Sequence, residues 1–188
     1  WPPFERFLRR EKTLSRGRLS GESTDLFDAL RQAEIVGPAL DSLIDLTEAY
    51  SIELDQALIR RNDSLDGDQY AIRDIFFEGD TDRAIALMQE EVDVRTTVRD
   101  VNESYGELLE VAIVDSMGAE RSEAFRDAVN LLSFDDVYEK TRTQSAFEAA
   151  KDLEDIDDET LALIEAIETQ FLAELARPRV ARADQQRL

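Results

Sequence analysis

Apolar residues recur at alternating spacings of three and four between Asp80 and Met117, and this pattern constrains the fold more than any other feature of the chain. Glu91 interrupts a stripe formed by Ala84, Leu87, Val94, Val98, Val101, Tyr105, Leu108 and Ala112. Such spacing places apolar side chains on one face of an α-helix. Asp80 or Thr81 is suited to cap the start of this helix, and Gly118 is suited to end it. The sequence therefore predicts a rod about 50 Å long.

The composition of the whole chain agrees with a helical fold. Its 188 residues include only seven Gly and four Pro, and two of the prolines stand at positions 2 and 3. No segment shows the alternation and β-branched enrichment of a strand, and no run of eighteen apolar residues predicts a transmembrane helix. We predict one all-α domain, built from extended antiparallel helical hairpins or a bundle with two or three long helices.

Apolar spacing and breakers predict further helices around the central one. We expect a short helix capped by Ser23 or Thr24 and ending near Gly37, then a long helix opened by Pro38. That helix is predicted to end near Asn62, with a break at Asp63–Asp68, and a helix over Asp68–Glu78 closed by Gly79 follows the break. After the central helix we expect a helix over Ala119–Leu132 and then a less regular stretch from Ser133 or Asp135 to Ala150. The last predicted helix covers Ile156–Ala176, and Pro178 bends or ends it.

Charge is distributed unevenly along the chain. The net charge is −21, but residues 1–20 carry +4 and residues 176–188 carry +3, which leaves −28 on residues 21–175. An acidic middle of this kind repels nucleic acid and anionic membranes. We therefore predict a basic N-terminal arm (1–22), an acidic helical domain (23–176) and a basic C-terminal tail (177–188). The acidic surface either serves solubility alone or receives the basic ends of neighbouring copies or of another protein.

The N-terminal arm combines aromatic and basic residues, a composition that is enriched in protein interfaces. Its predicted partner-binding residues are Trp1, Phe4, Phe7, Arg9, Arg10, Arg16 and Arg18. The alternative is that this segment folds back onto its own bundle.

Residues for catalysis or metal binding are sparse. Without Cys or His, the chain lacks thiolate ligands, the commonest transition-metal ligand and the commonest general base, so we expect neither an enzyme nor a cofactor. The sequence from Asn62 departs from a calcium loop because Arg73 stands where a Glu is required. The acidic run Asp152–Glu159 offers oxygen ligands for weak Ca²⁺ or Mg²⁺ binding, although capping of the last helix explains part of it. Glu91 and Arg95, one turn apart, are predicted to pair with each other or with a neighbouring helix.

One hydrophobic pattern occurs twice, and it introduces a family resemblance. A shift of 121 residues superposes Ile35, Leu40, Leu43, Leu46, Tyr50, Glu53 and Leu54 on Ile156, Leu161, Ile164, Ile167, Phe171, Glu174 and Leu175. Generic helical periodicity is the alternative explanation. The chain has a long helix with Leu46-Thr47-Glu48-Ala49-Tyr50 and a rod that ends in Val98–Asn102 and Tyr105. This order of helices resembles that of the Spy-like and CpxP-like periplasmic helical proteins. Those proteins carry two LTxxQ repeats; here Tyr50 takes the Gln position.

This resemblance implies an ATP-independent envelope chaperone or stress protein, dimeric, binding unfolded clients on a concave face. It also implies a periplasmic or extracellular location, and a chain that begins at Trp1 is expected after signal-peptide removal or in a fragment. The family's client-binding face is basic, whereas the middle of this chain is strongly acidic. The first hypothesis is therefore a non-catalytic assembly subunit that docks through its basic terminal arms, and the chaperone is the alternative.

Overall fold

Two compact units make up the chain, Trp1–Ser133 and Phe134–Leu188. The structure is a computed structural model that describes residues 1–153 and 156–187, except for the side chains of residues 67–73, 76 and 187. Helices account for 84% of the chain, and no strand occurs in the described residues. The predicted all-α class is therefore confirmed, whereas the division between the units falls inside the predicted 23–176 domain.

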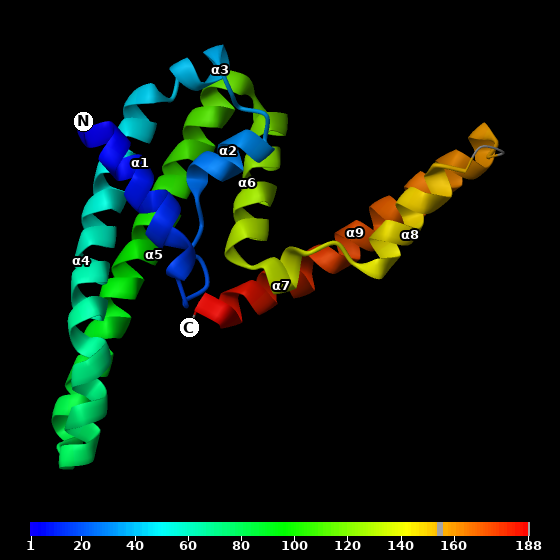
Figure 1. The fold of residues 1–188 in the computed structure, drawn as a ribbon. Coiled ribbons are helices and arrows are strands. Elements are labelled where there is room, and N and C mark those ends of the chain that lie inside the picture. Colours follow the sequence, from blue (N-terminus) through cyan, green and yellow to red (C-terminus); the bar gives the residue numbers. More distant parts are fainter. Residues whose placement is uncertain (154–155, 188) are drawn as a thin grey trace. The chain divides into compact units, whose positions relative to one another are not determined.

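A long antiparallel hairpin of α4 (Ile44–Glu78) and α5 (Thr81–Met117) forms the frame of the first unit (Figure 1). The turn depends on Gly79, whose positive φ of 78° suits glycine. Asp80 then caps α5, because its carboxylate accepts a hydrogen bond from the Arg83 N–H at 3.2 Å. Gly118 ends the helix. The predicted central helix is thus confirmed with its predicted caps.

The buried stripe of α5 follows the prediction only as far as Tyr105. Val98 and Tyr105 are buried as expected, but Leu108 is exposed and Leu109 and Ile113 are buried instead. An α-helix has 3.6 residues per turn, so its buried face drifts by about 20° per heptad from a strict alternation of three and four. The predicted stripe was therefore one residue out of phase in the last turns.

The predicted break at Asp63–Asp68 is wrong. α4 is one helix of 35 residues that runs through Gly67 without interruption, so the predicted helix over Asp68–Glu78 is its second half. A glycine inside a helix costs only about 1 kcal/mol relative to alanine, and pairing with α5 along its length offsets a cost of that size. A helical backbone also leaves no loop for the calcium-type ligands that begin at Asn62.

Shorter helices pack around the inner half of this hairpin, residues 44–61 of α4 and 95–117 of α5 (Figure 1). They are α1 (Pro2–Thr13), the 3₁₀ turn η1 (Leu14–Arg16), α2 (Leu26–Gln32), α3 (Pro38–Asp41) and α6 (Ala119–Ser133). Asp25 caps α2 by accepting from the Phe27 N–H at 2.9 Å, so the predicted caps Ser23 and Thr24 are wrong. Pro38 opens only the four-residue α3, which is separate from α4.

One core joins these helices to the hairpin. α1 and α5 contact α4, and α6 packs on both α5 and α2. The largest fully buried apolar side chains of this unit are Leu26, Leu30, Ile35, Leu43, Tyr50, Leu54, Leu58, Leu109, Ile113 and Phe125. All of them belong to α2, the α2–α3 loop, the segment before α4, the inner half of the hairpin, or α6.

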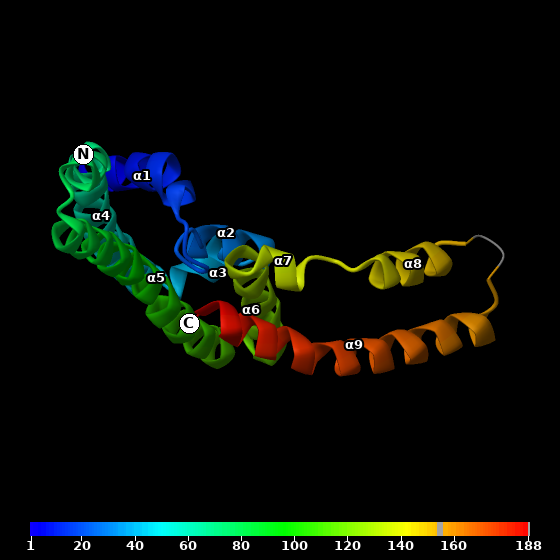
Figure 2. The same cartoon turned by 90° about the horizontal axis from the view of Figure 1, so that it is seen from below.

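The second unit is a helical pair with a short cap. α8 (Arg142–Lys151) lies alongside α9 (Asp158–Arg187), as Figure 2 shows, with ring centroids of Phe147 and Phe171 5.9 Å apart and Lys151 Nζ 2.8 Å from Glu168 Oε2. Before them, α7 (Asp135–Tyr138) contributes to a small cluster in which Phe134, Val137 and Ala183 are buried.

The last helix continues well past its predicted end. Pro178 lies inside α9, which extends to Arg187. Proline lacks an N–H, so one backbone hydrogen bond is lost there, but α9 continues through Pro178 without a break, and Ala183 beyond it packs into the α7 cluster. Residues 177–187 are therefore part of a folded helix, and the predicted separate C-terminal tail is wrong.

Candidate functional site

The arm predicted to bind a partner is the helix α1, and it is attached to its own chain by arginines. Arg6 donates to Ser51 Oγ at 3.1 Å and pairs with Glu48, and Arg9 pairs with Asp55. All three partners lie on α4, whose surface is acidic there. The position of α1 therefore agrees with the alternative prediction, that the arm folds back onto its own bundle.

Arg10 binds a different element, the start of α2. Its Nε lies 3.0 Å from Asp25 Oδ2, and its guanidinium carbon stands 4.3 Å from the ring centroid of Phe27. Burial raises the pKa of the Asp25 carboxyl, and the nearby Arg10 charge opposes that increase. Cation–π contacts of this kind are worth about 0.5–2 kcal/mol, so Arg10 ties α1 to α2.

The aromatic side of α1 faces away from the hairpin. Trp1, Phe4 and Phe7 keep 84%, 52% and 46% of their surface exposed, and α1 has no buried residue at all. Phe4 and Phe7 stack on each other with centroids 6.5 Å apart. An amphipathic helix normally buries its apolar stripe; α1 instead turns Arg6 and Arg9 toward α4, leaves Trp1 and Phe4 mostly in solvent and places the half-exposed Phe7 ring 5.5 Å from the Arg10 guanidinium. We call Trp1, Phe4 and Phe7 the ring surface.

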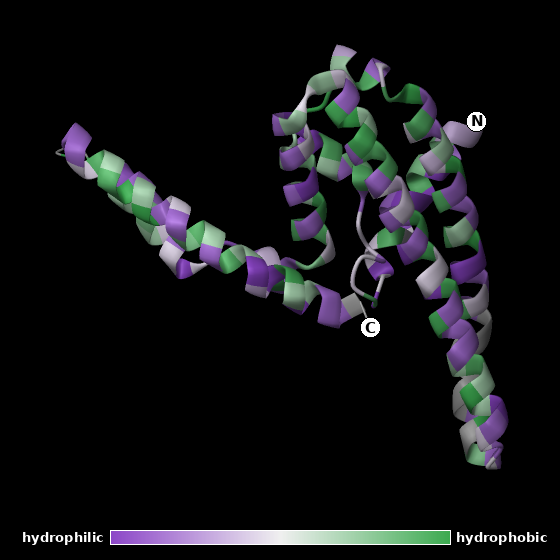
Figure 3. Cartoon of the chain, turned by 180° about the vertical axis from the view of Figure 1, so that it is seen from behind, coloured by the Kyte–Doolittle hydropathy of each residue, from purple (hydrophilic) through white to green (hydrophobic). Residues whose placement is uncertain are grey.

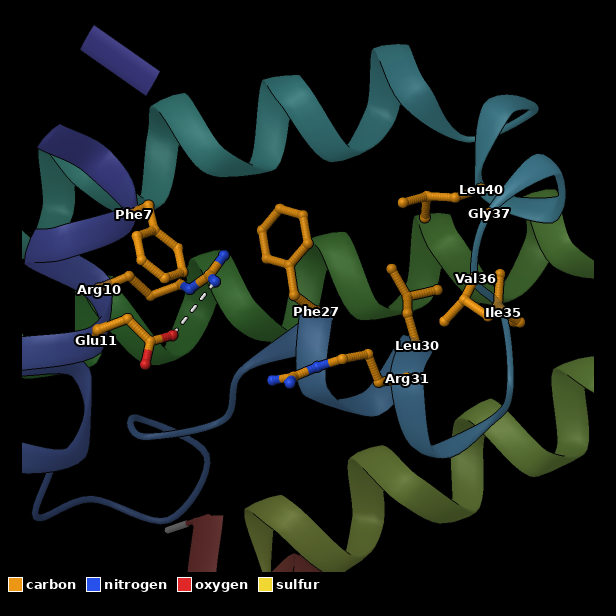
Figure 4. A pocket seen from close by; sticks show the side chains of 10 residues that line it. All are labelled: Phe7, Arg10, Glu11, Phe27, Leu30, Arg31, Ile35, Val36, Gly37 and Leu40. Atoms are coloured by element: carbon orange, nitrogen blue, oxygen red, sulfur yellow. Dashed lines mark ion pairs between the residues drawn. The ribbon is translucent and has the colours of Figure 1, made fainter. Parts of the chain in front are cut away.

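A cavity of about 400 Å³ adjoins this ring surface at Phe7. Figure 4 shows the Arg10 guanidinium between the rings of Phe7 and Phe27, with apolar side chains of α2 and the following loop on the far side. The lining residues are Phe7, Arg10, Glu11, Phe27, Leu30, Arg31, Ile35, Val36, Gly37 and Leu40. The ring surface thus continues into a hollow large enough for an apolar side chain of a partner.

The C-terminal end of α1 is fixed by a buried charge cluster. Glu22 Oε1 accepts from Arg61 Nη1 at 2.9 Å and from Arg95 Nη1 at 3.1 Å, and both Glu22 and Arg61 are fully buried. The same two arginines also donate to main-chain carbonyls, Arg61 to Thr13 and Arg95 to Arg16. One carboxylate therefore holds two helices and the end of α1 together.

Further hydrogen bonds complete this cluster. The other Glu22 oxygen accepts from the main-chain N–H groups of Arg18 and Leu19 at 2.7 and 3.1 Å. Arg95 Nη2 donates to Glu91 Oε1 at 2.9 Å, which confirms the predicted Glu91–Arg95 pair. Burial lowers the pKa of Arg61, and its hydrogen bond with Glu22 opposes that shift. The buried guanidinium is retained as a cation because its carboxylate partner is buried with it.

A buried tyrosine and asparagine fasten the same loop two to three turns further along the hairpin. Tyr50 donates its hydroxyl to Asn102 Oδ1 at 3.0 Å, and Asn102 Nδ2 donates to the carbonyls of Gly21 and Glu22 at 3.0 and 3.1 Å. Burial raises the pKa of the Tyr50 hydroxyl above its usual range. Tyr50, which takes the Gln position of the family motif, thus serves the core of this protein.

The remaining predicted site residues follow α1, with Arg16 in η1 and Arg18 in the loop after it. Arg16 and Arg18 have exposed side chains, as does Lys12. The Arg18 guanidinium reaches Glu91 at 3.8 Å. Of the seven predicted residues, Arg9 and Arg10 serve internal contacts, whereas the three aromatic residues together with Arg16 and Arg18 face solvent.

The cluster around Glu22 and Arg61 was missed from the sequence, although one signal pointed to it. Arg61 follows Leu54 and Ala57 at helical spacing, so it continues the core face of α4. A charge on a core face requires a buried counter-charge. Glu22 stands 39 residues away in a loop, and helical spacing alone does not identify such a distant partner.

Neither a metal site nor a membrane span is found in the described part of the chain. No group of three or more carboxylates is placed to hold an ion there; Glu154 and Asp155 of the predicted Asp152–Glu159 site lie outside the described residues. Asp157 instead accepts from the Thr160 N–H at 2.7 Å at the start of α9. None of the described helices is both long and apolar enough to cross a bilayer.

No protein-family model, curated protein or solved structure matches this chain. The resemblance to Spy-like and CpxP-like proteins therefore stays a prediction.

Proposed function

We propose that this protein is a non-catalytic assembly subunit that docks on another protein chain through the ring surface of α1. The orientation of α1 is the observation that carries the proposal. Exposed apolar residues scattered singly need no explanation, but adjacent aromatic residues on one helix face favour a binding surface. Here Phe4 and Phe7 stack on each other in solvent while the arginines of the same helix bind α4.

The exposed charge around the ring surface is mixed. Residues 1–20 carry a net charge of +4, but Arg6, Arg9 and Arg10 form internal ion pairs, and the exposed Lys12, Arg16 and Arg18 are accompanied by the exposed Glu5 and Glu11. Mixed charges of this kind favour a partner with a complementary pattern of charges and contribute to its selection. The basic residues at 177–187 are not part of the proposed binding surface, because they belong to α9 and Arg179 donates to Glu139 O and Gln144 Oε1.

The proposal is tested by the double substitution Phe4→Ala/Phe7→Ala, with Val111→Ala/Val114→Ala as the matched control on an exposed part of α5. Light scattering over a wide range of protein concentration gives the mass of each variant. We expect the wild type and the control to exceed the 21.4 kDa of a single chain and the α1 variant to remain a monomer. If the control and the α1 variant both exceed the mass of a single chain to the same extent, docking through the ring surface is refuted.

The chaperone implied by the resemblance remains the alternative proposal, since exposed rings beside a cavity also suit transient binding of unfolded chains. Suppression of client aggregation at equimolar ratio without nucleotide is the measurement that separates it from assembly. A chaperone is expected to suppress aggregation of the client while its own assembly remains a small oligomer. An assembly subunit is expected to form larger assemblies without a client and to leave aggregation of the client unchanged.

A further inference from the structure

The cavity beside the ring surface is lined by exposed residues as well as by residues of the core. Phe7 and Val36 are 46% and 54% exposed, whereas Leu30 and Ile35 keep only 2% and 1% of their surface exposed. Figure 4 shows Phe7 on one side of the cavity and, on the other, the apolar side chains Leu30, Ile35, Val36 and Leu40. An occupant of this cavity therefore reaches from the protein surface to the apolar core of the first unit.

The cavity differs from single apolar residues on the surface. In Figure 3, hydrophobic positions are interspersed with hydrophilic ones along the helices, and exposed apolar residues that are scattered singly need no explanation. In the cavity, six of the ten lining residues have apolar side chains, and they surround a volume of about 400 Å³. Binding pockets are concave and mostly apolar, with volumes of roughly 300–1,000 Å³. The cavity has the size and the lining of such a pocket.

The charged side chains of the lining are all paired within the chain. Arg10 Nε lies 3.0 Å from Asp25 Oδ2, Arg10 Nη2 lies 3.5 Å from Glu11 Oε1, and Arg31 pairs with Asp28. A charged group that enters the cavity has to compete with these pairs, and it loses its water without gaining an unpaired opposite charge. An uncharged apolar group displaces water from the apolar walls at no such cost. The lining therefore favours an uncharged apolar occupant.

The volume indicates how large this occupant is. An apolar cavity of about 150 Å³ holds a benzene ring, and the cavity here is about 400 Å³. The two fused rings of an indole fill more of this space than a single ring does. Large aromatic side chains are also the residues that contribute most binding energy at protein interfaces, above all where they enter desolvated pockets.

We propose that the cavity receives an uncharged apolar side chain, about the size of an indole, from the protein that docks on the ring surface. This inference rests on the proposed function and adds the chemistry of the partner's anchor residue and the place where it binds. The cavity and the ring surface share Phe7, so a chain that covers Phe4 and Phe7 lies next to the cavity. The rings contact the partner around its anchor, and Leu30 and Ile35 contact the anchor itself.

Binding of small probes tests the chemistry of the cavity. N-acetyltryptophanamide is an uncharged indole probe, N-acetyltryptophan adds a carboxylate, tryptamine carries an ammonium group, and N-acetylalaninamide lacks the indole. Methyl NMR signals of Leu30, Ile35, Val36 and Leu40 report binding in protein dilute enough to be monomeric. We expect saturable shifts with the uncharged indole probe, binding weaker by roughly tenfold or more for both charged indoles, and no shift with N-acetylalaninamide. Absence of saturable shifts, or equal binding of charged and uncharged indoles, would overturn the inference.

A cavity-filling substitution connects the cavity to association. Val36→Phe enlarges an exposed side chain of the lining, and Val111→Phe makes the same change at an exposed position of α5 outside the cavity. We expect Val36→Phe to weaken both probe binding and association at least several-fold, and Val111→Phe to change neither. Because both positions are exposed, both variants should unfold at the urea concentration of the wild type, which separates a blocked cavity from a damaged fold.

The outcomes separate this inference from the proposed function. If Phe4→Ala/Phe7→Ala is monomeric while Val36→Phe associates as strongly as the wild type, the partner covers the rings without entering the cavity; the inference is overturned and the proposed function stands. If Phe4→Ala/Phe7→Ala associates like the wild type, both proposals fail.

Competition distinguishes a partner's side chain from a free small molecule as the occupant. Saturating N-acetyltryptophanamide is expected to lower the mass of the associated wild type toward the 21.4 kDa of a single chain, because probe and anchor occupy the same space. A probe that binds the cavity and leaves the mass unchanged would overturn the inference, since the cavity would then hold small molecules independently of docking.

Discussion

α1 and the loop that follows it are neighbours in the sequence, yet they attach to the hairpin in opposite ways. The loop buries a charge, Glu22, between two arginines of the hairpin, whereas α1 leaves three aromatic residues in solvent. Buried charges are costly unless they are fully paired, and exposed aromatic residues forgo the gain of burial. The comparison separates two tasks: the charge cluster determines where α1 lies, and the ring surface remains available for association.

The largest expected effect is on the charge cluster. Glu22→Gln removes the negative charge that Arg61 and Arg95 share, so the fully buried Arg61 loses its counter-charge and Arg95 keeps only Glu91. We expect the free energy of unfolding to fall by about 3–5 kcal/mol, measured by urea denaturation at a concentration where the protein is monomeric. Glu107→Gln, an exposed position on α5, is the control and should change little. A loss no greater than that of the control would show that the cluster does not hold the fold.

A smaller loss is expected at the tyrosine that fastens the same loop. Tyr50→Phe leaves Asn102 Oδ1 without its donor, inside the core. Removing one partner of a buried hydrogen bond costs about 1–3 kcal/mol. The comparison variant is Tyr105→Phe, because the Tyr105 ring packs at a tilt against Tyr50 with centroids 5.5 Å apart but its hydroxyl hydrogen-bonds to Glu53 nearer the surface. If the two variants lose equal stability, the buried hydrogen bond to Asn102 has no special role.

The ion pairs that hold α1 should contribute less again. Arg9 and Asp55 are partly exposed, and pairs of this kind are worth about 0–1 kcal/mol. Arg9→Gln should therefore leave global unfolding almost unchanged while it speeds amide exchange in α1. Equal exchange rates in α1 of the variant and the wild type would mean that Arg9 does not position the helix.

The smallest expected effect on stability comes from the ring surface. Phe4→Ala/Phe7→Ala should shift the free energy of unfolding of the monomer by no more than about 0.5 kcal/mol, because substitutions on exposed surface rarely exceed that. The same variant is expected to lose association entirely. A loss of several kcal/mol would place the rings in the folded core and remove the distinction between the two regions.

Local sequence patterns predicted the helices well and their mutual contacts poorly. The spacing over Asp80–Met117 identified α5 with its caps, since a helix is specified by neighbours three and four residues apart. The break at Asp63–Asp68 was predicted from polar residues and a glycine, but α4 continues because it pairs along α5. Pro178 was expected to end or bend α9, but the helix continues through it to Arg187, and Ala183 in that last part packs on the α7 cluster.

The candidate site shows the same limit. Aromatic and basic residues marked α1 as a candidate, but which face turns inward depends on Glu48 and Asp55, which lie more than forty residues away in the sequence. An amphipathic pattern by itself favours burial of the rings. The acidic surface of α4 reverses that preference, because it offers partners to the arginines and no groove to the rings.

Trp1 provides the most direct measurement, because it is the only tryptophan in the chain and belongs to the ring surface. Acrylamide quenching of its fluorescence reports its exposure in the unmodified protein. We predict strong quenching in dilute monomer, and reduced quenching with a blue-shifted emission as the mass rises with concentration. Quenching that stays constant while the mass increases would contradict the account, since the protein would then associate without covering the ring surface.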